Sequence, residues 1–570
     1  MDRLRPHSAV IDIDDTLRRL QIEDLLADND WHDRILPFVT PGAPYESPWS
    51  RLVDAPYVLL TRLFELGMPR EQALDLASLV WPPILLAPLI WLSCGAAQRL
   101  LGRSLNALDA ALVGLFLIQA AVEFAPGRID HHNFQILLLA LFIRGLTIEN
   151  PQASGLVMAG AATLSITVGL EAVPMLIIGL TGVAIAAVFK QPGAETRMQS
   201  AGIGLAVFAP LAALIFAGPS DFIQTHCDAI SAPWILALAG AGLILTGARA
   251  AWQLAGTGSA LPRVALLAAA LTVLMILLWN VFPDCRSGPL HMIDPVTQSF
   301  WLDNVPQDAP AHTLVPQPAG LPLAVLLAAA IAICGPCAAA GLRDWQQGRP
   351  ETIIFVAIVA AGIVMSLFAI RYMRITFFLA ALATPLAVST LLQRSAEGEG
   401  GRRRWTAAAL AGSAAFFVAG FALPRGPHAE VSASYHLFRY DSCAGEDFSA
   451  LHRLAPGVIM APFGLHYAII EAETPHTLST ISFYRSAPGI RKLATAFTTE
   501  EPAELRAALA GVDYVVVCSS NTAVPLDDMP LLRDLRRGQP PTGLEQIARS
   551  TPSRVTIYRI DHDRVGGTPG

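Results

Sequence analysis

Charge is scarce in this sequence. Only 15% of its 570 residues are Asp, Glu, Lys or Arg, whereas an ordinary soluble domain contains about 25%. This deficit excludes a disordered chain and a simple soluble enzyme. An excess of basic residues is also missing, because the net charge is −7 and the pI is near 6.0, so no basic surface is available to bind nucleic acid. Seven cysteines are too few for a disulfide scaffold.

Apolar residues are abundant instead. They make up 53% of the chain, and the mean hydropathy is +0.48. A helix needs about 20 apolar residues to cross a bilayer, so the long apolar runs predict a polytopic α-helical membrane protein. We place about 12 spans, at residues 74–94, 107–124, 133–147, 153–169, 172–189, 201–218, 233–250, 263–281, 320–342, 352–369, 375–392 and 405–423.

Positive residues lie mainly in alternate loops: Arg99, Arg103, Arg144, Lys190, Arg197, Arg249, Arg343, Arg349, Arg394 and Arg402 to Arg404. The opposite loops hold only Arg128, Arg286, Arg371 and Arg374. The positive-inside rule therefore places the N-terminal segment and the tail on the outer side. An exported N-terminal segment needs a preceding signal or helix, so we expect a thirteenth, first helix that this chain lacks. The alternative is that residues 1–54 stay inside and the helix count is wrong by one.

Three regions follow from this pattern. Residues 1–73 would form a first external loop with an acidic motif, and residues 74–423 a transmembrane helical domain. Residues 424–570 would form a periplasmic or extracellular α/β domain, because Tyr514–Cys518 and Val555–Ile560 are rich in β-branched and aromatic residues. We expect a multi-pass protein of the cell (inner) membrane.

Two polar motifs could hold a cation. Asp14 and Asp15 belong to the acidic stretch IDIDDTLR, where carboxylates repel one another unless a cation lies among them. The alternative is a solvated acidic loop. Asp130 and His132 lie in the stretch GRIDHHN beside an apolar run, and both can face one ion if this loop is extended. The alternative is a pair of interfacial histidines.

Two further features lie on the same expected outer face. Arg371 and Arg374 flank an apolar run and suit a phosphate or pyrophosphate, although arginines also anchor helix ends to lipid headgroups. Glu171 interrupts an apolar stretch between two spans. Glu171 would either bind substrate or only mark a loop.

This order of features resembles the C-type membrane glycosyltransferases, and in particular the oligosaccharyltransferase catalytic subunit. The stretches IDIDDTLRRLQIEDLL and PWSRLVDAP also look like a bacterial branch of such proteins with no assigned substrate. The resemblance implies that Asp15, Asp130 and His132 bind a divalent metal, with Asp130 and His132 forming a D-x-H motif. The family has thirteen spans, which again indicates a missing first helix.

The resemblance continues in the later part of the chain. The loop at 282–319 corresponds to an external loop that ends with a glutamate near the metal. Here that glutamate is absent, and the resemblance implies that Gln307 or the adjacent Asp308 takes its place. Arg371 or Arg374 would contact the lipid-linked phosphate. The segment 458–467 looks like the segment that carries the family's WWDYG motif, but WWDYG itself is not retained, so recognition of an Asn sequon is not carried over.

We therefore predict a glycosyltransferase that acts on the outer membrane face with a polyprenyl-phosphate or pyrophosphate-linked sugar donor. Its cofactor would be Mn²⁺ or Mg²⁺, Asp15 (with Asp14 beside it) would orient or activate the acceptor, and the acceptor would be a protein or a glycan. The alternative function is a transporter in which Glu171, Asp130 and His132 relay protons. Disulfides are permitted on the outer side, so we expect Cys443–Cys518 and Cys227–Cys285.

Overall fold

The chain divides into two compact units. The structure is a computed structural model that describes residues 13–27, 29–40, 42–392, 399–423, 446–518, 528–549 and 554–565. The helical unit comprises residues 1–32, 49–289 and 307–424, and the sheet unit comprises residues 33–48, 290–306 and 425–570.

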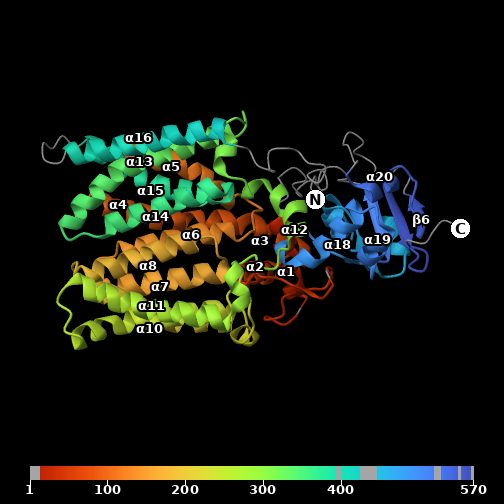
Figure 1. Cartoon of the computed structure of the whole chain (residues 1–570), viewed down its shortest axis with the longest axis horizontal. Coiled ribbons are helices and arrows are strands. Elements are labelled where there is room, and N and C mark those ends of the chain that lie inside the picture. The colour runs from red at the N-terminus through yellow and green to blue at the C-terminus, as the bar shows by residue number, and fades with distance from the viewer. Residues whose placement is uncertain are drawn as a thin grey trace. The chain divides into compact units, whose positions relative to one another are not determined.

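Helices make up most of the helical unit (Figure 1). In chain order they are α1 (Ile13–Leu26), α2 (Arg51–Phe64), α3 (Arg70–Ile84), α4 (Leu86–Leu101), α5 (Ala107–Ala121), α6 (His132–Leu146), α7 (Pro151–Val168), α8 (Val173–Val188), α9 (Ala194–Phe216), α10 (Ala232–Leu254), α11 (Ala260–Val281), α13 (Leu321–Gln346), α14 (Glu351–Phe368), α15 (Met373–Leu392) and α16 (Glu399–Ala422).

Every apolar run predicted from the sequence forms a helix. The first run is formed by α3 and α4 in succession, and α3 ends just after Pro82 and Pro83. Within the part of the chain that the structure describes, nine helical segments are long and apolar enough to cross a membrane. They are Arg70–Leu101, Ala107–Phe124, Ala194–Phe216, Ala232–Leu254, Ala260–Val281, Leu321–Gln346, Glu351–Phe368, Ile370–Leu392 and Arg403–Ala422, and α6 and α8 are shorter apolar helices.

Small residues allow these helices to approach closely. A Cβ at Gly202 of α9 would lie 2.6 Å from the carbonyl oxygen of Gly242 in α10, and the reverse distance is the same. Glycines at helix crossings are typical of membrane bundles, where backbone contact replaces the hydrophobic effect. Helix α15 lies deepest, with 78% of its most apolar stretch buried, whereas α11 has none of its stretch buried.

The N-terminal segment is more helical than the sequence indicated. Asp14 and Asp15 occupy the first turn of α1 instead of a loop, and a second helix, α2, follows in the same segment. Carboxylates are stabilised at that end of a helix by the partial positive charge of the unpaired N–H groups.

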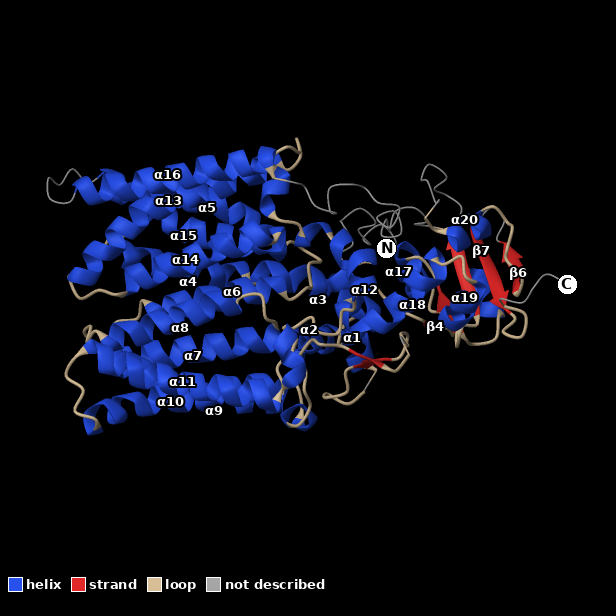
Figure 2. Cartoon of the chain, viewed as in Figure 1, coloured by secondary structure: helices blue, strands red, loops and turns tan. Residues whose placement is uncertain are grey.

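The sheet unit contains a five-stranded mixed sheet (Figure 2). The strand order is β4-β3-β5-β7-β6. β3 is parallel to β4 and β5, and β7 is antiparallel to β5 and β6. The elements of this unit are β1 (Ile35–Leu36), β2 (Tyr45–Glu46), α12 (Pro295–Phe300), β3 (Val458–Met460), α17 (His466–Glu471), β4 (Thr477–Leu478), α18 (Ala487–Thr498), α19 (Pro502–Leu509), β5 (Tyr514–Cys518), α20 (Pro530–Arg536), β6 (Leu544–Arg549) and β7 (Val555–Ile560).

The two strands expected in the tail are thus β5 and β7, and they are direct neighbours. The register pairs Val515 with Tyr558 and Val517 with Thr556. The segment 458–467 supplies β3 and the start of α17.

Candidate active site

Asp130 lies between two imidazoles at the start of α6. Its Oδ2 is 3.0 Å from Nε2 of His132, and its Oδ1 contacts Nδ1 of His131. Asp130 and His132 are only 2% and 4% exposed. The loop is not extended as expected, because His131 has helical backbone angles (φ −76°, ψ −11°) and His132 is the first residue of α6. The turn nevertheless brings the ligand atoms of these three residues within 4.8 Å of one another.

Glu171 contacts the other nitrogen of the His132 ring. Its Oε2 is 3.0 Å from Nδ1 of His132, and it comes from the short connection between α7 and α8. The structure therefore joins Glu171 to the D-x-H pair, which sequence reasoning left undecided.

The first-turn residue Asp15 holds the backbone of the same loop. Its Oδ1 accepts a hydrogen bond of 2.9 Å from the N–H of Asp130, and its Oδ2 forms an ion pair with Arg128. Asp14 interacts electrostatically with Arg371. Asp14 and Asp15 are adjacent in the sequence, but their carboxylates interact with different arginines.

A chain of ion pairs connects this cluster to the arginines of α15. Arg128 also contacts Glu123 at 3.0 Å, and the second oxygen of Glu123 lies 3.3 Å from a terminal nitrogen of Arg374. Glu123 was not predicted as a site residue. Its only local signal is that it is a charged residue at the end of an apolar run.

The two predicted loop residues lie against the same arginines. Both oxygens of Asp308 contact the Arg371 guanidinium, at 2.6 and 2.8 Å. Arg374 donates to Oε1 of Gln307 at 3.4 Å and to the carbonyl oxygen of Arg371 at 3.0 Å. The guanidiniums are therefore held in place by the protein itself.

The acidic groups of the cluster are held ionised. Burial alone would raise the pKa of Asp130, but the charges of His131 and His132 lower it well below the usual range. Burial likewise opposes ionisation of Glu171, yet His132 and Arg374 bring its pKa below the ordinary value. Burial lowers the pKa of His131, although Asp130 opposes this effect. The ionised form is the one in which a carboxylate binds a metal.

The donor set fits a divalent cation. Oδ2 of Asp130, Nδ1 of His132 and Oε2 of Glu171 are buried and make no hydrogen bond of good geometry, although they lie at 3.0 Å from their neighbours. Buried polar atoms are normally hydrogen-bonded, so the buried Oδ2 of Asp130, with Nε2 of His132 at 3.0 Å, is suitably placed to bind a cation together with that nitrogen. Carboxylate and imidazole ligands suit Mn²⁺ and Zn²⁺, and carboxylate oxygens suit Mg²⁺.

A buried polar network lies behind the D-x-H loop and was not predicted. Arg18 and Arg51 both contact the carboxylate of Asp54, at 2.9 and 3.3 Å, and all three side chains are fully buried. The Arg18 guanidinium lies 4.4 Å from the ring centre of Trp49, which in turn lies 5.9 Å from the ring of His131. Trp49 of the stretch PWSRLVDAP thus lies beside His131 of the D-x-H loop.

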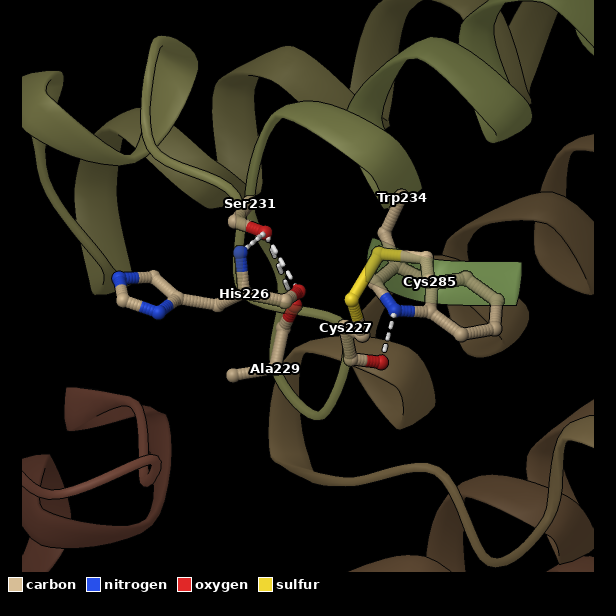
Figure 3. Close-up of a disulfide and its surroundings, with 6 residues drawn as sticks. All are labelled: His226, Cys227, Ala229, Ser231, Trp234 and Cys285. Carbon is tan, nitrogen blue, oxygen red and sulfur yellow. Dashed lines mark hydrogen bonds between the residues drawn. A yellow bond between two sulfur atoms is a disulfide. The ribbon is translucent and has the colours of Figure 1, made fainter. Parts of the chain in front are cut away.

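A disulfide joins two connections of the helical unit (Figure 3). Cys227 and Cys285 are bonded, with a Cα–Cα distance of 5.2 Å. The indole N–H of Trp234 donates to the carbonyl oxygen of Cys227 at 3.0 Å (Figure 3). Cys518 is also disulfide-bonded, whereas its expected partner Cys443 lies outside the described residues.

These features define a class: a polytopic helical membrane protein with a buried acid–imidazole cluster linked to a pair of arginines. No protein-family model matches the sequence, and no curated protein sequence matches it. Solved structures do match. The chain has the fold of the archaeal oligosaccharyltransferase AglB from Archaeoglobus fulgidus in complex with an inhibitory peptide and a dolichol-phosphate, with a TM-score of 0.58 and 14% identity over 89% of this chain and 65% of that chain.

Two other structures of the Archaeoglobus fulgidus enzyme match similarly. The complex with Zn and sulfate gives a TM-score of 0.54 at 14% identity, over 89% of this chain and 64% of that one. The form tethered to an acceptor peptide containing the NVT sequon gives 0.55 at 14% identity, over 89% and 65%. This chain thus spans less than two thirds of the length of these structures, and the likeness is one of fold.

Proposed function

We propose that this protein is a membrane glycosyltransferase that transfers a sugar or oligosaccharide from a polyprenyl-phosphate or polyprenyl-pyrophosphate donor. One observation carries the proposal. Within a fold shared with an oligosaccharyltransferase, the ion-pair chain Asp15–Arg128–Glu123–Arg374 joins the acid–imidazole cluster to the candidate phosphate-binding arginine.

The donor phosphate would bind Arg374, with Arg371 beside it. A guanidinium stays protonated at any working pH and can grip two phosphate oxygens at once. Sulfate and a dolichol-phosphate are bound in the archaeal structures, which supports a phosphate-bearing lipid as the donor class. The apolar helices would accommodate the lipid tail, so affinity need not come from the sugar alone.

The cation would be held by Asp130 and His132, with Asp15 as the third group. A carboxylate oxygen has two lone pairs, so Asp15 can keep its hydrogen bond from the N–H of Asp130 while it faces a cation. When bound, a divalent metal would neutralise charge on the departing phosphate. Zn is present in one archaeal structure, and we propose Mn²⁺ or Mg²⁺ here.

Asp15 is also our candidate for orienting or activating the acceptor, with Asp14 next to it. The acceptor class stays open between protein and glycan. The archaeal enzyme has been tethered to a sequon peptide, but the corresponding segment here reads VIMAPFGLHY. We place the reaction on the outer face of the cell membrane, because Cys227 and Cys285 are bonded and disulfides persist in oxidising compartments.

The proposal is tested with the full chain in lipid nanodiscs. The assay incubates the protein with radiolabelled polyprenyl-phosphate and polyprenyl-pyrophosphate sugars and measures label released from the lipid. We expect release to stop in EDTA, to return with Mn²⁺ or Mg²⁺, and to fall by roughly two orders of magnitude or more in Asp130→Asn. The control is Glu149→Gln, an exposed partner of Arg99. Release that is unaffected by both EDTA and Asp130→Asn would exclude the proposed chemistry.

A proton-relay transporter is the second candidate. Each nitrogen of His132 lies 3.0 Å from a carboxylate oxygen, and such a chain can also pass protons. A relay requires no divalent metal. Proton flux into protein-containing liposomes that persists in EDTA, with no release of sugar from lipid, would favour the transporter.

A further inference from the structure

His132 is the only residue of the cluster whose two ring nitrogens both face a carboxylate among the described residues. Nε2 lies 3.0 Å from Oδ2 of Asp130, and Nδ1 lies 3.0 Å from Oε2 of Glu171. An imidazole that binds a metal through one nitrogen keeps its proton on the other. The two carboxylates must therefore have different roles.

The grouping of ligand atoms indicates which side would hold the metal. The atoms of Asp130, His131 and His132 that lie within 4.8 Å of one another form a potential metal site, and Nε2 is the His132 nitrogen next to Asp130. Nδ1 is then the protonated nitrogen, and Glu171 is its acceptor. Metal-binding histidines commonly donate their second N–H to a carboxylate in this way.

We propose that Glu171 is a positioning residue that fixes the tautomer and ring orientation of His132, so that Nε2 points its lone pair at the metal. This inference rests on the metal site proposed above. It assigns to Glu171 a role through His132, without a bond of its own to the cation.

The local backbone supports a fixed position for Glu171. Helix α7 ends at Val168, and a Cβ on the next residue, Gly169, would lie 3.0 Å from Nε2 of Gln135 and 3.5 Å from Cδ2 of His131. The connection therefore passes directly against the first turn of α6. Glu171 also precedes α8, which begins at Val173 with Pro174 in its first turn, and the helix dipole there favours an anion.

The burial of the Oε2 atom of Glu171 is consistent with this role. Its Oε2 is buried without a hydrogen bond of good geometry, and so is Nδ1 of His132. Both atoms would be satisfied by one N–H···O bond once the ring adopts its metal-bound orientation. A loop glutamate without a binding or positioning role would be expected to have its carboxylate in water.

The experiment measures cation binding and does not depend on turnover. The full chain in nanodiscs is titrated with Mn²⁺, free Mn²⁺ is followed by electron paramagnetic resonance, and Co²⁺ reports the ligand set by its visible spectrum. The variants are Glu171→Ala, Glu171→Gln and His132→Ala. The matched control is Glu351→Gln, because Glu351 also lies at a helix N-terminus and pairs with Arg197 at 2.8 Å.

We expect Glu171→Ala to weaken Mn²⁺ binding roughly 10- to 100-fold while the Co²⁺ spectrum keeps the wild-type ligand number. Glu171→Gln should lie between the wild type and Glu171→Ala, because an amide oxygen still accepts the N–H but carries no charge. Glu351→Gln should bind as the wild type does. His132→Ala should change the Co²⁺ spectrum, because it removes a ligand.

Three outcomes would overturn the inference. If Glu171→Ala and Glu171→Gln both bind Mn²⁺ as tightly as the wild type, Glu171 does not position His132. If Glu171→Ala loses a ligand in the Co²⁺ spectrum, Glu171 binds the metal directly. If the wild type binds neither Mn²⁺ nor Co²⁺, the proposed metal site fails together with the inference.

Discussion

Asp15 accepts a hydrogen bond from the backbone N–H of Asp130 at 2.9 Å, across 115 positions of the sequence. The contact ties the first turn of α1 to the loop that precedes α6. Because the donor is a main-chain group, Asp15 fixes where the Asp130 backbone lies and not only what charge surrounds it. The ion pair of Asp15 with Arg128 extends the same link to Glu123 and Arg374.

Replacing Asp15 separates these two contributions. Asp15→Asn keeps an oxygen that can accept the N–H of Asp130 but loses the charge opposite Arg128, whereas Asp15→Ala loses both. We expect sugar release from the lipid donor to fall roughly 100-fold or more in Asp15→Asn and further in Asp15→Ala. Glu23→Gln is the control, since Glu23 lies on the same helix and pairs with Arg19. If Asp15→Ala is as active as Glu23→Gln, Asp15 is not part of the active site.

The helices were predictable because hydropathy is a local property. Each apolar run becomes a helix regardless of its partners, and the D-x-H pair meets because its members are two residues apart. The link from Glu123 to Arg374 was not predictable, because it depends on how the end of α5 meets the start of α15. No local sequence pattern indicates that these two helix ends lie in contact.

The burial of the Arg18 and Asp54 side chains was not predictable from the sequence, for a similar reason. Charged residues in a polar segment favour a solvated surface, yet both side chains are fully buried and paired at 2.9 Å. Only the packing of α1 against α2 makes this pairing possible. The resemblance to C-type glycosyltransferases indicated the positions of Asp15, Asp130 and His132, but it gave no expectation for the residues behind them.

Arg374 should not tolerate lysine. A lysine offers a point charge and cannot grip two phosphate oxygens, and it would also weaken the contacts to Gln307 and Glu123. The charge-assisted contact contributes roughly 1.5–3 kcal/mol, so donor affinity or rate should fall about 10- to 100-fold in Arg374→Lys. The measurement is release from the lipid-linked sugar at matched protein levels.

Arg286→Lys is the matched control for Arg374→Lys, because Arg286 lies over the exposed Trp279 ring and away from the ion-pair chain. Tyr372 would be a poor control, since it interacts electrostatically with Glu171 and Arg371. Should Arg371→Lys and Arg374→Lys both retain wild-type turnover, these arginines would serve only as interfacial anchors.

Cysteine labelling tests the disulfides and the proposed compartment together. Cys94, Cys334 and Cys337 are the free cysteines among the described residues. If Cys443 pairs with Cys518, three of the seven cysteines should react with a maleimide mass tag in denatured, unreduced protein, and all seven should react after reduction.

The single variant Cys227→Ser provides the internal check. It should add one reactive thiol before reduction, because Cys285 loses its partner. The free thiols are trapped with the maleimide tag in the cells, before the protein is isolated. If unreduced wild-type protein treated in this way carries seven tags, the result would contradict both disulfides and the placement of these segments in an oxidising compartment.

His466 should make the sheet unit sensitive to acid. Its side chain is 2% exposed, and its Nε2–H donates to the carbonyl oxygen of Ala461 at 2.9 Å. Burial lowers the pKa of His466 to about 4, against about 6.5 in an unfolded chain. Between these two values the unfolded state binds a proton that the folded state does not. The stability of the sheet unit should therefore fall as pH decreases from about 6.5 to about 4, by on the order of 3 kcal/mol at most.

Hydrogen exchange of the full chain measures this loss, with rates corrected for the intrinsic pH dependence of exchange. We expect amide protection in β3 and α17 to decrease between pH 7 and pH 5 in the wild type, and to decrease much less in His466→Gln, which does not titrate in this range. His452→Gln is the control, because His452 is an exposed histidine in the same unit. If His466→Gln loses protection with acid as steeply as the wild type, another group sets the acid sensitivity of this unit.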